Sequence, residues 1–277
     1  MIKVVKAWKF DQAIAKNISK IGRIINKETL LAFLAFFLLL VIWWLISAYF
    51  SYDLIPDPKI VISETIKLFY SQEFYYNLFL TLKRIFFGFS ISFLSGIVIS
   101  ILICRSNKLE SILKGPILLG LIIPSIIFAF VSIVLLGAKE VTALLIIFLI
   151  TTPQLIVIIS SGLKNINPEF TEVGEIFQIN FQSKFFDIIL PQIAPSFFAA
   201  VKTGIANTWK GTIVAEIFAL ANGIGSRIYD EFGLFSLKGV LSWALAFILI
   251  LSATYFVINL IEKKLLKWQY HYGKDRV

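Results

Sequence analysis

The sequence predicts an all-α membrane protein with six transmembrane helices. Three observations support this fold class. First, 58% of the 277 residues are apolar and only 16% are charged, whereas soluble domains have about 45–50% and about 25%. Second, the mean hydropathy is +0.86. Third, the apolar residues gather in runs of roughly 20, the length of a helix that crosses the hydrocarbon core of a bilayer.

The chain begins with a polar and basic segment, residues 1–28, and its first apolar run follows from Leu30 to Phe50. This run is long for the core of a signal peptide, and no A-x-A-like cleavage site comes after it. We therefore expect it to remain as the first span.

A shorter element is predicted between the first two spans. Pro56 and Pro58 punctuate the stretch, and Ile62, Ile66 and Phe69 then recur at helical spacing, which predicts a short interfacial helix. In the second span, two glycines stand eight residues apart. They either let a neighbouring helix approach closely or are ordinary glycines of a membrane helix. These two glycines are Gly88 and Gly96.

Five spans are predicted after the first. They are expected near 81–103, 115–136, 141–162, 192–220 and 239–262.

The positive residues predict the orientation. If the N-terminus is cytoplasmic, the inside segments carry 17 lysine and arginine residues and the outside segments carry five. This bias predicts that both termini face the cytoplasm of a cell-membrane protein. The basic residues are dispersed between apolar runs, so the net charge of +9 does not indicate nucleic-acid binding. The predicted organisation is a cytoplasmic segment 1–28, a transmembrane domain 29–268 and a cytoplasmic tail 269–277.

The residue inventory argues against catalysis by this chain. It has one cysteine, Cys104, and one histidine, His271, so neither an intrachain disulfide nor a Cys/His metal site is expected. It has no G-x-x-x-x-G-K-[ST] loop with which to bind ATP phosphates. An intramembrane enzyme would need a nucleophile–base pair or metal ligands within its spans. We therefore expect no catalytic residues, no metal and no cofactor in this chain.

The polar stretch "EVGEIFQINFQSKFFDIILPQIAP" interrupts the apolar runs. Phe170, Val173 and Phe177 form one helical stripe, and three glutamates occupy a different side. A short turn and a second apolar group lead to Pro191, which predicts helix, turn, short helix and then the fifth span. Acidic side chains are unfavourable beside an anionic leaflet, where surface helices usually carry Lys and Arg. This favours docking to another protein over resting on lipid headgroups.

The same stretch resembles the cytoplasmic signature of permeases of binding-protein-dependent ABC importers. That signature is E-A-A, three residues, G, nine residues and I-x-L-P. Glu172-Val173-Gly174 stands in place of E-A-A, and Ile188-Ile189-Leu190-Pro191 matches I-x-L-P at the right spacing. Gln178 occupies the glycine position, where a positive φ suits glycine better. Asn180 is the alternative residue for that conformation.

The resemblance extends over about residues 54–268, by motifs in matching order. These are "LIPDPKIV", "TLKRIFFGF", "NPEFTEVGEIF", "VAEIFALANGIGSRIYD" and "KKLLKW". Together they look most like the subgroup that serves nitrate, taurine, aliphatic sulfonates and thiamine-pyrimidine precursors. An alternative is a stand-alone channel or secondary transporter, but the latter often shows an inverted repeat, and none is visible in the residues.

The resemblance implies a type I ABC importer permease fold with a cytoplasmic coupling element at 168–190. Two permeases, by analogy a homodimer, would form the path for a small anion or small organic solute. Two ATPase subunits would bind ATP and Mg and dock on the coupling element, and an extracytoplasmic binding protein would deliver the substrate. The residues it assigns to coupling are Glu172, Val173, Gly174, Phe177, Gln178, Ile188, Leu190 and Pro191.

Polar residues in the fifth span are candidates for the translocation path. A charge inside the bilayer is costly, so such residues usually face a cavity or a partner. Interhelical hydrogen bonding at a dimer seam is the other interpretation. Lys210 is expected in the outer half of the membrane, either attracting an anion or pairing with Glu216 of the same or the opposing subunit. The candidates are Asn207, Thr208, Trp209, Lys210 and Glu216.

Overall fold

The structure is a computed structural model that describes residues 30–50 and 54–265. The predicted segments 1–28 and 269–277 lie outside the described residues. Contacts divide the chain into two compact units, one up to Ser63 and one from Glu64 onward. Every regular element in the described ranges is a helix, so the predicted all-α class is confirmed.

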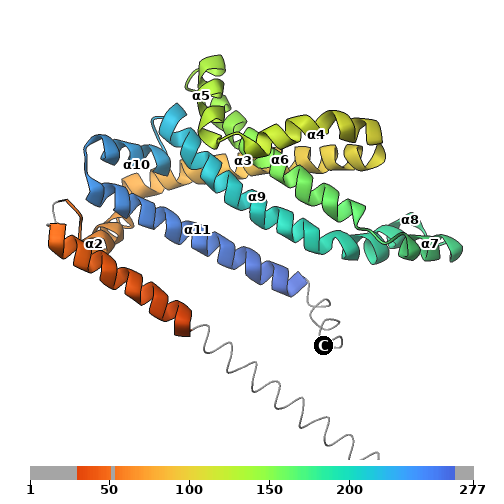
Figure 1. Ribbon diagram of the computed structural model, residues 1–277, viewed down its shortest axis with the longest axis horizontal. Coiled ribbons are helices and arrows are strands. Elements are labelled where there is room, and N and C mark those ends of the chain that lie inside the picture. The colour runs from red at the N-terminus through yellow and green to blue at the C-terminus, as the bar shows by residue number, and fades with distance from the viewer. Residues whose placement is uncertain (1–29, 51–53, 266–277) are drawn as a thin grey trace, which may run out of the picture. The chain divides into compact units, whose positions relative to one another are not determined.

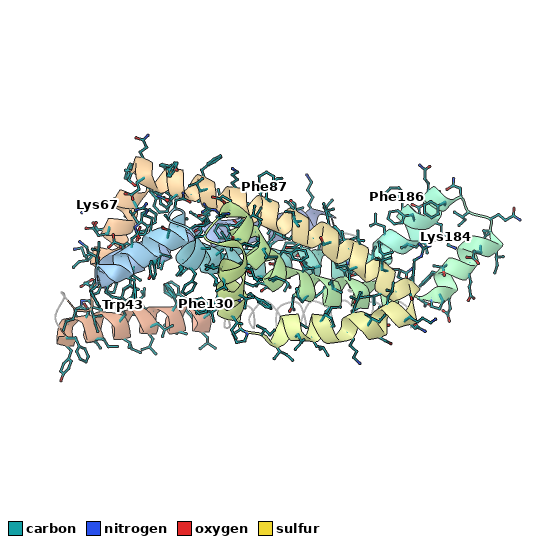
Figure 2. The ribbon with its side chains drawn as sticks, turned by 90° about the horizontal axis from the view of Figure 1, so that it is seen from above. Trp43, Lys67, Phe87, Phe130, Lys184 and Phe186 are labelled. Atoms are coloured by element: carbon teal, nitrogen blue, oxygen red, sulfur yellow. The ribbon has the colours of Figure 1, made fainter. Side chains whose placement is uncertain are left out.

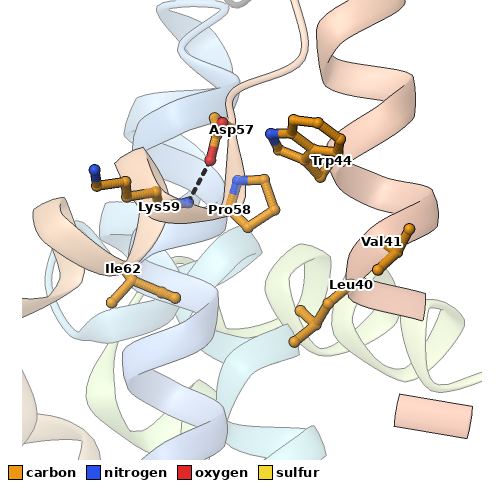
Figure 3. A pocket seen from close by; sticks show the side chains of 7 residues that line it. All are labelled: Leu40, Val41, Trp44, Asp57, Pro58, Lys59 and Ile62. Carbon is orange, nitrogen blue, oxygen red and sulfur yellow. Dashed lines mark hydrogen bonds between the residues drawn. The ribbon is translucent and has the colours of Figure 1, made fainter. Parts of the chain in front are cut away.

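The first unit contains the helix Leu30–Phe50 and the start of α2, Pro58–Leu68. Trp43 Nε1 donates to the carbonyl of Pro56 at 3.1 Å, and Ser47 Oγ donates to the carbonyl of Ile55 at 2.6 Å. These bonds fold the turn back along the first helix and leave an apolar cavity of about 330 Å³ (Figure 3). The short helix expected after Pro58 is confirmed, and its interfacial position stays a prediction.

The second unit holds the remaining spans. Helices α3, α6 and α11 run past both predicted limits, α9 begins two residues earlier and ends one residue sooner than predicted, and α10 was not predicted at all. The helices are α3 Gln72–Arg105, α4 Asn107–Ile122, α5 Ser125–Leu136, α6 Glu140–Lys164, α7 Pro168–Ile176, α8 Phe181–Ser183, a π-helix Lys184–Ile189, α9 Leu190–Ala219, α10 Ile224–Gly233 and α11 Leu237–Leu265. Within the described residues, five helices are long and apolar enough to cross a membrane, or six if the bent pair α4–α5 counts as one span.

The span expected at 115–136 is not one straight helix. The structure breaks it into α4 and α5, whose axes meet at 105°. Pro124 lies at the break, and Ile123 before it is extended, with φ −64° and ψ 125°. Proline disfavours helical geometry in the residue that precedes it and donates no backbone hydrogen bond. The apolar run therefore continues through a point where the helix cannot.

Helix α6 forms the centre of the second unit, because it packs along both α3 and α9 (Figure 1). Glycines permit the close approach of α3. A Cβ on Gly88 would lie 2.6 Å from Cγ2 of Ile147, and one on Gly96 would lie 3.0 Å from Cβ of Leu155. Of the two interpretations of these glycines, close helix packing is confirmed.

Loops that the lysine and arginine count places on the same side of the membrane lie at the same end of the second unit. At one end, Lys164 of α6 bridges Glu110 of α4 at 2.5 Å, and α7 follows directly. At the other end, Arg227 of α10 lies 3.3 Å from Glu73 of α3. In Figure 1, α7 and α10 accordingly lie at opposite ends of α9. Which end faces the cytoplasm stays a prediction.

Candidate functional site

The segment 168–190 folds as a helix, a turn and a second helix. Asn167 caps α7, because its side chain accepts a hydrogen bond from the N–H of Glu169 at 2.9 Å. Asn180 caps the next helix in the same way, accepting from the N–H of Ser183 at 2.7 Å. One feature differs from the predicted order. The second helix does not end before the fifth span, and Phe181–Ala219 is one helical stretch of 39 residues.

A π-helix, Lys184–Ile189, makes this continuity possible. It directly precedes Leu190-Pro191 at the start of α9. A proline ring clashes with the carbonyl four residues earlier in an α-helix and leaves it without a donor. That carbonyl belongs to Asp187, inside the π-helix, where the turn is wider. The chain therefore passes Pro191 without breaking.

Helix α7 is fastened to the helix that follows it. Gly174 is buried, and a Cβ there would lie 2.9 Å from Cδ1 of Ile188. Lys184 Nζ lies 2.6 Å from Glu175 Oε1, and this hydrogen bond lowers the pKa of the Glu175 carboxyl. At the base of the element, the N–H of Asn167 donates to the side chain of Gln192 at 2.8 Å. The structure thus brings the predicted residues Gly174 and Ile188 into contact.

The turn after α7 has the conformation that the signature glycine would adopt. Gln178 has φ +51°, whereas Asn180 has φ −63°, so the expectation that Asn180 supplies the positive φ is wrong. The N–H of Ile179 donates to the carbonyl of Gly174, and that of Gln178 to the carbonyl of Glu175, both at 3.0 Å. These two bonds form a Schellman motif, which requires a left-handed residue at the position of Gln178.

The element exposes apolar side chains on both of its helices. Ile176 and Phe177 are about three-quarters exposed, and Phe181 is 80% exposed. Figure 2 shows Phe186 and Lys184 on this element. Glu172 is also exposed and has no ion pair with a described residue. Contiguous exposed apolar surface of this kind marks an interaction site. Its large apolar members are Phe170, Val173, Ile176, Phe177, Ile179, Phe181 and Phe186.

A second cluster, buried and charged, surrounds Arg84 of α3. Its side chain is only 2% exposed, and Glu216 of α9 is fully buried. Arg84 Nη1 donates to Glu216 Oε1 at 2.8 Å, and Thr81 Oγ1 donates to the same oxygen at 2.8 Å. The other carboxylate oxygen accepts from the N–H of Gly225 at 2.8 Å. Glu216 therefore pairs with Arg84 and not with Lys210 of the same subunit, and a pairing of Glu216 and Lys210 across two subunits stays a prediction.

The loop between α9 and α10 closes over this carboxylate. Gly223 has φ +107°, and a Cβ there would lie 2.3 Å from Cδ of Glu216, so only glycine fits the position. Arg84 also reaches Glu140 at the start of α6, at 2.6 Å, and the backbone and side chain of Asn222. The cluster joins α3, α6, α9 and the loop through one guanidinium. Arg84 lies in the motif "TLKRIFFGF", but that motif does not indicate which residues Arg84 contacts.

A polar cavity of about 200 Å³ lies at the bend between α4 and α5. Gly120 of α4 sets its position, since a Cβ there would lie 2.5 Å from Cγ of Pro153 in α6. This close contact holds the broken helix beside α6 and α9. The lining residues are Gly120, Leu121, Ile123, Ser125, Phe128, Ile150, Gln154 and Asn207.

The five candidate path residues on α9 do not share one surface. Asn207 lines the cavity, and Lys210 is exposed. Thr208, by contrast, is buried with its hydroxyl 3.4 Å from that of Thr151. Trp209 is 1% exposed and packs edge-on against Phe247. With Glu216 also buried, Asn207 is the one candidate of the five that lines this cavity, and Lys210 is the one that is exposed.

Comparison with known proteins places this geometry in a family. Residues 92–267 match the model of the binding-protein-dependent transport system inner membrane component. The putative aliphatic sulfonates transport permease of Bacillus subtilis is 23% identical over 222 residues, which cover 80% of each chain. The nitrate import permease of Synechococcus elongatus is 22% identical over 70% of this chain and 73% of its own.

Two further similarities were found. The formylaminopyrimidine transport permease of Halalkalibacterium halodurans is 26% identical over 84% of this chain and 94% of its own. Among solved structures, a crystal structure of an amino acid ABC transporter is 19% identical with a TM-score of 0.49. It covers 76% of this chain and 96% of that one.

Proposed function

Because this chain belongs to the family of binding-protein-dependent transport system inner membrane components, we propose that it couples solute import to ATP hydrolysis by separate subunits. The chain is a multi-pass permease subunit of an ABC importer with the type I permease fold. In our proposal two copies form the path, two ATPase subunits bind ATP and Mg, and both termini face the cytoplasm.

The observation that carries the proposal is the exposed surface of the element 168–190. It presents large apolar side chains on the same helix as Glu172, an exposed carboxylate that pairs with none of the described residues. An apolar stripe with an acidic edge is suited to a groove on a protein that offers basic side chains. We place the ATPase docking site here.

The anchoring of α7 supports coupling as well as docking. Gly174 packs on Ile188, and Asn167 bonds to Gln192. Any displacement of α7 therefore acts directly on the first turns of α9. Since α9 also carries Asn207 at the polar cavity, one continuous helix links the proposed docking site to the proposed path.

The opposite end of the second unit offers a surface for the binding protein. Phe232, Leu234 and Phe235 at the turn from α10 to α11 are 63%, 76% and 93% exposed. The lysine and arginine count assigns this end to the outer face. Such an exposed apolar group suits a docked protein partner.

The relatives support a small anion or small organic solute as the substrate. The relatives are named for the transport of aliphatic sulfonates, nitrate and formylaminopyrimidine. All three are small polar solutes. We propose that this chain carries a member of the same set of chemical classes, in a homodimer.

Charge reversal at Glu172 tests the docking role. Glu172→Lys should weaken co-purification of the ATPase subunits at least tenfold while the permease still inserts and folds. A pair desolvated in a groove costs about 3–5 kcal/mol to break, whereas an exposed pair is worth about 0–1 kcal/mol. The measurement is retention of the ATPase on the tagged permease, together with ATP hydrolysis stimulated by the binding protein.

Glu73→Lys is the matched control, because it makes the same charge change at the far end of the unit and loses only an exposed contact with Arg227. It should retain the ATPase at the wild-type level. Wild-type ATPase retention and stimulated hydrolysis in Glu172→Lys would show that the docking site lies elsewhere.

A further inference from the structure

The cavity at the α4–α5 bend contains polar side chains that have no partner among the residues that the structure describes. Gln154 of α6 and Asn207 of α9 both line it, and neither amide makes a hydrogen bond to another residue that the structure describes. Ser125, the first residue of α5, lines the same space. Polar groups at membrane depth are costly unless they meet water, a partner or a solute. Three such groups converging on one cavity therefore indicate a ligand.

The charges around the cavity favour an anion. Each carboxylate on the four lining helices already has a cationic partner among the described residues, although Arg84 serves two of them. Glu110 pairs with Lys164, and Glu140 and Glu216 both pair with Arg84. The lining residues themselves include no acid. Amide and hydroxyl groups that donate hydrogen bonds, with no free carboxylate nearby, are suited to the oxygens of an anion.

Lys210 does not line the cavity, but it carries a positive charge on the same helix as Asn207. It follows Asn207 by three residues on α9, about 4.5 Å along the axis, so the two lie on adjacent faces of the helix. Its side chain is exposed and makes no ion pair or hydrogen bond with any residue in the described ranges. The other lysine within α9, Lys202, is instead paired with Glu262. Lys210 is thus the free cation of this helix.

The cavity size limits the solute. At about 200 Å³ it is smaller than the roughly 300–1,000 Å³ of pockets for drug-sized ligands. A small solute with two or three acceptor oxygens can meet both amides at once.

We propose that this cavity is an oxyanion subsite of the translocation path. Gln154, Asn207 and Ser125 donate hydrogen bonds to a nitrate-like or sulfonate-like group, and Lys210 attracts it. This inference rests on the proposed function, because it assigns a substrate class and a location to the same path. It divides the relatives' substrates by chemistry, favouring the oxyanions over the neutral pyrimidine.

Thiol labelling of the purified full-length permease in liposomes tests the inference. In a Cys104→Ser background, Asn207→Cys is treated with an anionic sulfonatoethyl or a cationic trimethylammonioethyl methanethiosulfonate. The anionic reagent should react faster at Asn207→Cys, relative to the cationic one, by about tenfold compared with the control position. Focusing by local charge raises encounter rates by about 10–10³-fold.

Asn259→Cys on α11 is the control, since it places the same substitution in another spanning helix outside the cavity. Adding Lys210→Gln should abolish the preference for the anionic reagent, and Lys210→Arg should keep it. Nitrate and methanesulfonate should slow the labelling of Asn207→Cys, whereas a neutral aminopyrimidine should not. No charge preference, a preference that survives Lys210→Gln, or protection by the pyrimidine alone would each overturn the proposal.

The labelling needs neither the ATPase nor the binding protein, so it stays informative even if the docking proposal fails. Uptake by the complete complex provides the second measurement. Asn207→Leu and Lys210→Gln should each reduce uptake of labelled nitrate or taurine about tenfold or more at equal yields of assembled complex. Asn259→Leu should transport like wild type. Wild-type oxyanion uptake by both cavity variants would overturn the assignment, even with coupling intact.

Discussion

Removing the guanidinium of Arg84 should destabilise the permease more than most single substitutions. Arg84→Met deletes five hydrogen bonds: two to Glu140, two to Asn222 and one to Glu216. The losses are unequal. The side chain of Glu140 is 59% exposed, so water replaces its partner. Glu216 is fully buried and would be left without a countercharge.

The magnitude follows from that buried carboxylate. Breaking a buried ion pair by removing one partner costs about 3–5 kcal/mol. For a protein of this size, about 1 kcal/mol shifts the unfolding midpoint by roughly 2–4 °C. Arg84→Met should therefore lower the midpoint by about 6–20 °C. Arg105→Met, at the exposed end of the same helix, should shift it by only a few degrees.

The double variant separates the ion pair from packing. In Arg84→Met with Glu216→Gln, no charge remains buried, and the amide oxygen can still accept from the N–H of Gly225. The double variant should be more stable than the sum of the two single losses predicts, by an amount near the upper end of about 0.5–3 kcal/mol. Thermal unfolding midpoints are measured in one detergent for wild type, Arg84→Met, Glu216→Gln and the double variant. A wild-type midpoint for Arg84→Met, or strictly additive losses, would refute the reasoning.

Two further predictions concern topology and the coupling element. In a Cys104→Ser background, Phe235→Cys should be labelled only from outside the cell and Gln182→Cys only from the cytoplasm; labelling of both from the same side would contradict the orientation. Gly174→Leu should overpack the contact with Ile188, where a Cβ already lies 2.9 Å from Cδ1, at a cost of about 1–3 kcal/mol, and should reduce ATPase retention. Gln178→Gly should retain the ATPase fully, because glycine adopts the observed positive φ without strain. Equal ATPase retention by wild type, Gly174→Leu and Gln178→Gly would disprove the packing role of Gly174.

Elements bounded by charged residues were predicted well. Helix α6 begins at Glu140 and ends at Lys164, one and two residues beyond the predicted span, because hydropathy changes sharply at both points. Helix α3 begins nine residues earlier than predicted, at Gln72, where the sequence is too polar for a membrane run but still helical. The bend at Pro124 was missed because hydropathy stays high across it. The proline itself was the signal, since it restricts the residue before it.

The candidate site was predictable only where the signal was local. The stripe on α7 follows from the helical period, and Phe170, Val173 and Phe177 are indeed exposed together. The partner of Glu216 is 132 residues away in the sequence, and no spacing rule connects them. The π-helix before Pro191 also has no compositional signature. The cavity depends on a bend and on the contact of Gly120 with Pro153, so it arises from packing between helices.

The 39-residue helical stretch from Phe181 to Ala219 is geometrically a lever. From Pro191 to Ala219 it measures about 42 Å at 1.5 Å per residue. A tilt of about 10° around its proline-containing end would move Ala219 by roughly 7 Å, about the width of a small solute, and Asn207 by a little over half as much. Because the carboxylate of Glu216 is tied to α3 near the far end, such a tilt has to carry α3 along or break that bond. That ion pair, together with the packing of α9 along α6, therefore resists a tilt of α9 alone.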